Sequence, residues 1–353
     1  MANKKSVLLL FTGGTIGMAE DPTNHNCLQP IRFEAIQEMM PELEQTGINI
    51  KSIPFNPQID SSDVDTDLWE KIALTIEKYY DDFDGFVVLH GTDTMAYTAS
   101  ALSFMFENLA KPIILTGSQL PIGKLRTDAK ENLLTAIELA CSKNQYGAAK
   151  VPEVCVYFGD ELYRGNRTTK KNAEHFSAFR SYNYPLLAKV GVHIKYFTSN
   201  IRYPDKTALL KVHTKTDNNI AILKIFPGIS QYTVHSILST PNLKAVVLES
   251  FGLGNVPQKT WFEKELKIAE RKGIIIVNKT QCNTGSVEMG RYKTSLELIK
   301  IGVISANDCT IEAIITKLMC LLGQYQSTDA VKKLLKKDIA GEMTVSRQKK
   351  TNN

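Results

Sequence analysis

Apolar residues gather in four short runs in the first half of the chain, and each run stops at a polar, glycine-containing segment. The runs are VLLLF (7–11) before TGGTIG, FVVL (86–89) before HGTDT, IILT (113–116) before GSQLP, and VCVYF (154–158) before GDELYRGNRTTKKN. Unbroken apolar strands are typically buried on both faces, as in a parallel sheet. The pattern therefore predicts buried parallel strands, each followed by a polar loop.

Segments with helical spacing separate these strands. In 94–109 and 128–140 the apolar residues recur at the period of a helix, for example at Leu133, Ile137 and Ala140. Strands that alternate with helices predict an α/β fold with a doubly wound, mainly parallel sheet. Ligands of such folds bind beyond the carboxyl ends of the strands, so we expect the four polar loops to converge on one crevice.

A change of pattern divides the chain into parts. The segment 205–219 is polar and irregular, and new strand-like runs (IAILKIF, AVVLES, GIIIVNK) follow it before a final helical pattern at 308–322. We expect an N-terminal α/β domain that carries the four polar loops at 1–204, a linker at 205–219, a smaller C-terminal α/β domain at 220–343, and a flexible basic tail at 344–353.

The composition excludes several classes of protein. The chain has 353 residues, 43% hydrophobic and 22% charged, and a net charge of +5 without an RNA- or DNA-binding motif, which argues against a nucleic-acid partner. The apolar run at 7–11 is too short for a signal peptide, and no segment approaches the roughly 20 apolar residues of a membrane span. Together with six scattered cysteines, this predicts a cytoplasmic protein with reduced thiols and no membrane partner.

Motifs for metals and nucleotides are missing from the sequence. The histidines have no HExxH-like spacing, which gives a zinc site little support. Thr15 stands where the dinucleotide fingerprint GxGxxG needs its second glycine, and in GSQLPIGK Leu125 follows the lysine where a phosphate-binding loop needs Ser or Thr. We expect neither a metal nor an organic cofactor.

The polar loops supply hydroxyl, carboxylate and amine groups. These are the hydroxyls of Thr12, Thr15, Thr92, Thr94, Thr168 and Thr169, the carboxylates of Asp60 and Asp93, and the amine of Lys170. A threonine hydroxyl is a weak nucleophile until a neighbouring base accepts its proton, so this set suits nucleophilic acyl transfer. Singly, each residue has a simpler explanation, such as a tight turn, a helix cap, a solvated lysine or, for His90, a loop hydrogen bond. Their joint occurrence at strand ends favours an enzyme.

The loops also resemble those of a known family. TGGTIG at 12–17, HGTDTM at 90–95 and GNRTTKKN at 165–172, together with GSQLP and SFGLGNVP, are similar in order and spacing to the signature segments of the bacterial-type L-asparaginases, most of all the cytoplasmic (type I) enzymes. The resemblance covers nearly the whole chain. It implies hydrolysis of the side-chain amide of L-asparagine to L-aspartate and ammonia, in a homodimer or homotetramer.

The resemblance also implies roles for individual residues. Thr15 would be the primary nucleophile, and Thr92, Asp93 and Lys170 would form a second relay of hydroxyl, carboxylate and uncharged amine. The remaining positions concern the substrate: Asp60 and Ser61 would bind its amino and carboxylate groups together with Thr92 and Asp93, and Ser118 would lie beside the reacting amide.

Two positions depart from the family pattern. Some relatives have a tyrosine shortly after TGGTIG that activates the first threonine, whereas the comparable stretch here has none, and Tyr292 in MGRYKTS is the candidate replacement. Glu249 stands where the allosterically controlled enzymes have arginine, which argues against control by an asparagine effector. Three alternatives stay open: an enzyme that also hydrolyses L-glutamine, an amidotransferase-type amidase, and a catalytically silent amino-acid-binding protein.

Overall fold

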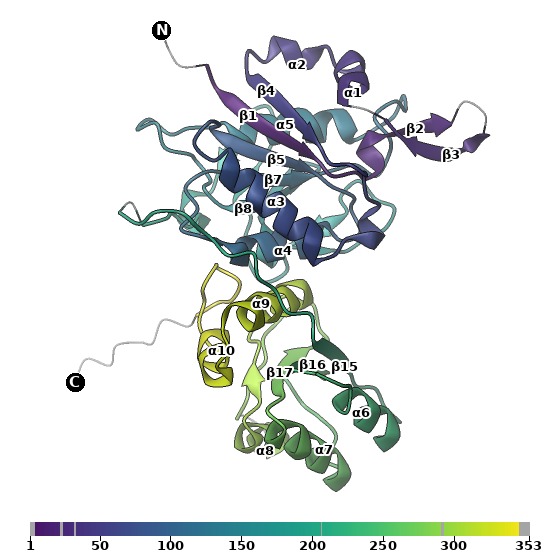
Figure 1. Ribbon diagram of the computed structural model, residues 1–353, viewed down its shortest axis with the longest axis vertical. Coiled ribbons are helices and arrows are strands. Elements are labelled where there is room, and N and C mark those ends of the chain that lie inside the picture. The colour runs from purple at the N-terminus through teal and green to yellow at the C-terminus, as the bar shows by residue number, and fades with distance from the viewer. Residues whose placement is uncertain (1–3, 22–23, 32, 206, 291–292, 346–353) are drawn as a thin grey trace. The chain divides into compact units, whose positions relative to one another are not determined.

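The computed structural model describes residues 4–21, 24–31, 33–205, 207–290 and 293–345. The chain forms two compact units, Met1–Thr214 and Lys215–Asn353, and each is built around a sheet with parallel strands (Figure 1). The predicted α/β class, with a larger N-terminal part and a smaller C-terminal part, is thereby confirmed.

The first unit contains an eight-stranded sheet in the order β13-β12-β9-β8-β7-β5-β1-β4. Its strands are β1 (Ser6–Phe11), β4 (Asn49–Pro54), β5 (Gly85–Leu89), β7 (Ile113–Thr116), β8 (Val154–Phe158), β9 (Glu161–Arg164), β12 (Ala188–Lys189) and β13 (Lys195–Tyr196). From β4 to β8 all neighbours are parallel, and from β8 onward they are antiparallel. Four of the parallel strands are the apolar runs seen in the sequence, which explains why those runs show no polar alternation.

Helices cover this sheet on both faces. They are α1 (Phe33–Met39), α2 (Glu42–Gln45), α3 (Thr66–Lys78), α4 (Met95–Met105) and α5 (Ala129–Ala140). Leu133 and Ile137 of α5 pack in one core cluster with Val7, Leu9 and Phe11 of β1. Because successive side chains of a strand point to opposite faces, Leu8 and Leu10 face the other side, and both are also fully buried. The two-sided burial predicted from the sequence is therefore observed, with helices on both faces of the sheet (Figure 1).

Short elements connect the main ones. They are the hairpins β2 (Met18–Asp21) with β3 (Asn24–Pro30) and β10 (Thr169–Lys170) with β11 (Phe179–Arg180), the pair β6 (Phe106–Glu107) with β14 (Lys211–Val212), and the 3-10 turns η1 (Thr15–Gly17), η2 (Ser61–Asp63), η3 (Gly165–Arg167) and η4 (Thr198–Asn200). Strand β14 lies inside 205–219, so that segment is less irregular than its sequence suggests.

Two sequence-based expectations about the first unit are wrong in detail. The helix expected at 94–109 ends at Met105, because Phe106 is extended and pairs with Val212 in β6 and β14. The polar segment after VCVYF is not one loop, since its residues 161–164 form β9, in which Leu162 and Tyr163 are buried. The charged residues Glu161 and Arg164 at the two ends of β9 made this buried antiparallel strand resemble a polar loop in the sequence.

The second unit has a four-stranded parallel sheet in the order β15-β16-β17-β18. Its strands are β15 (Ile220–Lys224), β16 (Ala245–Ser250), β17 (Ile275–Thr280) and β18 (Ile304–Ser305), and its helices are α6 (Gln231–Leu238), α7 (Thr260–Arg271), α8 (Lys293–Ile301), α9 (Ile311–Gln324) and α10 (Thr328–Leu335). Helix α9 begins later than the expected 308 because Thr310 caps it, its side chain accepting a hydrogen bond from the Ala313 N–H.

A buried ion pair holds the end of the second unit. Lys317 of α9 and Glu342 are both fully buried, with Nζ and Oε1 2.5 Å apart. Lys317 also donates to the carbonyl of Lys337, and Glu342 accepts from the N–H of Ala340. Burial by itself would raise the pKa of Glu342, but the charge and hydrogen bond of Lys317 outweigh burial and lower this pKa. Glu342 is therefore ionised at neutral pH.

We expect Lys317→Met to destabilise the protein by about 3–5 kcal/mol, because it leaves a buried carboxylate without its cation. The double variant Lys317→Met/Glu342→Leu should recover much of this loss, since it removes both buried charges. Chemical denaturation measures both effects.

The matched control is Lys300→Met, which removes the exposed pair of Lys300 and Glu297 and should leave the unfolding midpoint unchanged. A double variant no more stable than the single one would contradict an ionised buried pair.

Candidate active site

The register of the parallel strands places three polar loops side by side. Phe11, the last residue of β1, pairs with Leu89, the last residue of β5, and Leu89 in turn pairs with Thr116, the last residue of β7. The loops that begin at Thr12, His90 and Gly117 therefore leave the sheet at one level. The predicted convergence of these three loops is confirmed.

Two glycines allow the loops to approach closely. An ideal Cβ on Gly14, whose φ is +89°, would lie 2.5 Å from the backbone nitrogen of Gly91, and a Cβ on Gly91 would lie 2.5 Å from Oγ of Ser61. Real Cβ atoms do not tolerate such contacts, so both positions require glycine. The loops of Thr15 and Thr92 thus meet backbone to backbone, and the Ser61 side chain packs directly against the backbone of Gly91.

Hydrogen bonds fix the same three segments. The Thr12 hydroxyl donates to the carbonyl of Leu89 at 2.8 Å, and the Ile59 N–H donates to the carbonyl of Thr12 at 2.9 Å. The Thr94 hydroxyl donates to the carbonyl of Ser61 at 2.6 Å. The loops are therefore held by the sheet and by each other before any ligand arrives.

Lys170 joins this arrangement from a more distant part of the chain. Its Nζ lies 2.8 Å from Oγ1 of Thr92 and 2.6 Å from Oδ1 of Asp93, although 77 and 78 residues separate the partners. The Lys170 side chain is 16% exposed, whereas that of Asp93 is 67% exposed. The structure thus brings together hydroxyl, carboxylate and amine as the sequence predicted, with the carboxylate open to solvent.

Lys170 reaches this place by a different route from the one expected. Strand β9 first returns antiparallel to β8, and the chain then turns through η3 into the β10–β11 hairpin, where Lys170 pairs with Phe179. The lysine is therefore placed by a hairpin and not by the carboxyl end of β8.

Thr15 begins the turn η1 directly after Gly14 and is partly exposed. Because Gly14 touches Gly91, Thr15 and Thr92 each stand one residue beyond this contact, on adjoining loops. The structure therefore places the predicted first nucleophile beside the loop that carries the predicted relay.

The predicted substrate-binding residues lie in differing environments. Asp60 caps η2 and is exposed, and its pKa is lowered because the N–H and hydroxyl of Ser62 both donate to the carboxylate. Ser61 is buried against Gly91. Ser118 is also buried, and its hydroxyl donates to the carbonyl of Leu120 at 2.6 Å, so that this hydroxyl closes its own loop. Tyr292 lies outside the described residues.

One residue at the site was missed by the sequence analysis. Gln119 follows Ser118 in GSQLP, and its Oε1 accepts a hydrogen bond from the Thr92 hydroxyl at 3.3 Å. Its position three residues beyond the end of β7 was the available signal, but an uncharged amide did not stand out among hydroxyls and carboxylates.

A buried histidine makes a hydrogen bond to the backbone of the Thr92 loop. His90 is 1% exposed, and its Nδ1 lies 2.7 Å from the carbonyl of Gly91, while its Nε2 lies 2.9 Å from Oγ1 of Thr98. The Trp69 ring N–H donates to the same Oγ1. A neutral ring that donates from Nδ1 and accepts at Nε2 satisfies every group. Burial lowers the pKa of His90 to about 4, which agrees with a neutral ring and with the loop hydrogen bond favoured from the sequence.

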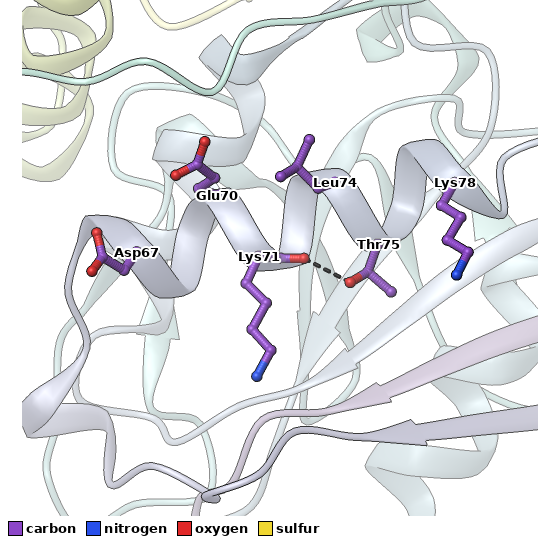
Figure 2. A pocket seen from close by; sticks show the side chains of 6 residues that line it. All are labelled: Asp67, Glu70, Lys71, Leu74, Thr75 and Lys78. Carbon is purple, nitrogen blue, oxygen red and sulfur yellow. Dashed lines mark hydrogen bonds between the residues drawn. The ribbon is translucent and has the colours of Figure 1, made fainter.

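A surface hollow lies away from these loops. A shallow surface depression of about 370 Å³ is lined by side chains of α3 alone, namely Asp67, Glu70, Lys71, Leu74, Thr75 and Lys78. Figure 2 shows them projecting from one helix, with no loop of the candidate site among them. This is a solvated helix face.

Among the described residues no cluster of three or more His, Cys, Asp or Glu side chains could hold a metal, and no helix is long and apolar enough to cross a membrane.

Fold and site together define a class: a two-unit α/β protein with a threonine, aspartate and lysine cluster at the carboxyl edge of a parallel sheet. Comparison with known proteins identifies the family. Residues 6–202 match the family model "Asparaginase, N-terminal", and residues 219–335 match "Glutaminase/Asparaginase C-terminal domain". The chain belongs to the asparaginase family.

Individual relatives agree over nearly the full length. The chain is 44% identical to L-asparaginase 1 of Escherichia coli over 97% of this chain and 98% of that protein. It is 40% identical to the 60 kDa lysophospholipase of Homo sapiens, over 97% of this chain and 62% of that protein. The crystal structure of L-asparaginase I from Vibrio cholerae superposes with a TM-score of 0.87 at 41% identity, covering 97% of this chain and all of the other.

The buried histidine yields a prediction for acid stability. The unfolded chain binds a proton at His90 near pH 6.5, whereas the folded protein does so only near pH 4. The unfolded state therefore binds more protons between these values, and stability falls as pH falls through this window. We expect His90 to remove about 3 kcal/mol of unfolding free energy between pH 7 and pH 4.

Urea unfolding at several pH values measures this loss. In His90→Gln, which cannot titrate, the decrease between pH 7 and pH 4 should be smaller by about the same 3 kcal/mol. Equal pH dependence in the two proteins would contradict a neutral buried His90.

Proposed function

We propose that the chain is an L-asparagine amidohydrolase, which converts L-asparagine and water into L-aspartate and ammonia. One observation carries this proposal: Lys170 Nζ lies 2.8 Å from the Thr92 hydroxyl and 2.6 Å from the Asp93 carboxylate, beside the loop of Thr15. Membership of the asparaginase family and the names of its relatives support the same activity.

In the proposed first half-reaction, the Thr15 hydroxyl attacks the side-chain amide carbon of the substrate. Its proton passes to a base as the C–O bond forms, the carbon–nitrogen bond then breaks, and the nitrogen leaves as ammonia after it gains a proton. The product is an ester between Thr15 and the aspartyl side chain.

In the second half-reaction, water attacks the ester carbonyl, the bond between that carbon and the Thr15 oxygen breaks, and aspartate is released as the Thr15 oxygen takes back a proton. The Thr92 hydroxyl accepts a proton from the water and passes one to Lys170 in its amine form, while Asp93 stabilises the resulting ammonium. The 2.8 Å and 2.6 Å contacts suit this relay because the heavy atoms already lie at hydrogen-bond distance, so only the Thr92 hydroxyl has to rotate before its proton is transferred.

Carboxylates around the same loops suit the amino group of the substrate. Asp60 and Asp93 are both exposed, and two carboxylates attract one ammonium. We assign them, with Ser61 and Thr92, to substrate binding, and we assign Ser118 to the loop that faces the reacting amide. Tyr292 remains our candidate for activating Thr15.

The direct experiment is to incubate dialysed protein with L-asparagine and to measure ammonia, without added nucleotide or metal. Release of ammonia and aspartate in equal amounts supports the proposal. Binding of asparagine without release would identify a silent amino-acid-binding protein instead.

A parallel assay with L-glutamine sets the substrate class. The two substrates differ by one methylene group, which a pocket separates by about 1–3 kcal/mol. We expect asparagine to have the higher kcat/KM. Turnover of glutamine alone would favour an amidotransferase-type amidase.

We further propose a cytoplasmic homo-oligomer, a dimer or a dimer of dimers, without a nucleic-acid or membrane partner. The buried thiols of Cys141, Cys155 and Cys320 form no disulfide, which suits a reducing compartment. Light scattering tests the assembly, and a mass equal to one chain would contradict it.

We predict that Thr15→Ala removes nearly all turnover while the protein stays folded, because the nucleophile is lost and its neighbours are not. Thr92→Ala and Lys170→Met should each have a similar effect, and Thr92→Ala/Lys170→Met should be little worse than either one, because residues that act as a unit are not additive. Ammonia release and circular dichroism provide the measurements.

Thr75→Ala is the matched control, because this threonine lies on α3 and its hydroxyl donates to the Lys71 carbonyl of its own helix (Figure 2). It should keep full turnover. If Thr15→Ala retained half of the wild-type rate, the nucleophile would have to be assigned elsewhere.

A further inference from the structure

Gln119 connects two parts of the site that the proposed chemistry needs at a fixed separation. Its Oε1 lies 3.3 Å from the Thr92 hydroxyl, and its Nε2 lies 3.0 Å from the carbonyl of Ala173 and 3.2 Å from that of His175. Ala173 and His175 belong to the loop between β10 and β11, and Lys170 is the last residue of β10. One side chain therefore joins the Thr92 loop to the hairpin that carries Lys170.

The two backbone carbonyls determine which way round this carboxamide lies. A carbonyl oxygen can only accept, so the group that faces Ala173 and His175 must be the NH₂, which has two hydrogens to donate. The reversed amide would place its oxygen against two other oxygens. The oxygen of Gln119 is thereby left facing Thr92 as an acceptor.

This orientation decides where the proton of Thr92 points. Lys170 donates to Oγ1 of Thr92, and the hydroxyl in turn donates to Oε1 of Gln119. In the resting site the hydroxyl proton therefore points away from the lysine. At 3.3 Å the bond to Gln119 is long and weak, so a small rotation of the hydroxyl can redirect its proton.

Both ends of this connection are themselves held. The backbone N–H of Gln119 donates to the carboxylate of Asp128 at 3.0–3.1 Å. On the hairpin side, Asn172 Oδ1 accepts from the N–H of His175 at 2.8 Å, and the guanidinium of Arg126 lies 5.6 Å from the centre of the Phe176 ring. Because the backbone and the carboxamide of Gln119 are both held by hydrogen bonds, this side chain can fix the distance between the Thr92 loop and the hairpin that carries Lys170.

We infer that Gln119 is a positioning residue for the proposed amide hydrolysis: its carboxamide directs the Thr92 hydroxyl and ties the Lys170 hairpin to the loop after β7. This inference rests on the proposed function. Gln119 acts by orienting Thr92 and Lys170, and it forms no covalent bond with the substrate itself.

Three variants test the inference. Gln119→Met keeps the length of the side chain and removes both kinds of hydrogen bond, whereas Gln119→Glu keeps an acceptor for Thr92 and places a carboxylate against two carbonyls at neutral pH. Gln145→Met, in an exposed loop, is the matched control and should behave as wild type.

We expect Gln119→Met to lower kcat for asparagine about tenfold, the effect of one neutral hydrogen bond, with little change in KM. Gln119→Glu should be similarly impaired at neutral pH. As pH falls, its carboxyl gains a proton that it can donate to a hairpin carbonyl, so its kcat relative to wild type should rise. The relative kcat of Gln119→Met should stay constant with pH.

Hydrogen exchange of segment 171–178 provides a readout that does not require turnover. Exchange there should be faster in Gln119→Met than in wild type or in Gln145→Met. Unchanged exchange would contradict the inference that Gln119 holds the hairpin of Lys170 to the loop after β7. With an active wild type, a Gln119→Met kcat above half the wild-type value, or a pH-independent ratio for Gln119→Glu, would overturn the effect on Thr92.

These outcomes separate the two proposals. A wild-type protein that releases no ammonia contradicts the proposed function and with it any catalytic effect of Gln119, whatever the exchange shows. An active wild type with unaltered Gln119 variants contradicts only the positioning role.

Discussion

The site depends on the alignment of parallel strands that end at the same level. Because Phe11, Leu89 and Thr116 are paired across β1, β5 and β7, the three following loops are neighbours as soon as the sheet forms. Close packing on both faces of the sheet fixes this register, since a shift by one residue would exchange side chains of different size between the two packed faces. The hydrophobic core thus determines where the polar loops of the candidate site lie.

Close backbone contact then makes the neighbouring loops into one rigid surface. Gly14 and Gly91 have no Cβ, so the Thr15 loop meets the backbone of the Thr92 loop, and the Ser61 side chain packs against Gly91. Hydrogen bonds from Thr12 and Thr94 fix the same contacts. Such preorganisation matters for acyl transfer because reacting groups that are already placed lose little entropy on reaching the transition state.

Charge is handled differently in different parts of the chain. His90 lies below the site and satisfies its neighbours without a charge, because each ring nitrogen has a partner of the right kind. In the second unit Lys317 and Glu342 are buried as an ion pair, and backbone groups meet their remaining hydrogen-bonding needs. Lys170 and Asp93 form a third arrangement, in which the carboxylate stays open to solvent and can meet a ligand.

The sequence by itself determined the α/β class, the four buried runs and the set of polar residues at the strand ends, because apolar periodicity and glycine-rich loops are local signals. It also carried the family resemblance that the comparisons establish. Only the tertiary structure decided that Lys170 arrives through the β10–β11 hairpin, that the segment after VCVYF hides the strand β9, and that Gln119 lies between Thr92 and the hairpin loop. These features rest on contacts between residues many positions apart, which no local pattern records.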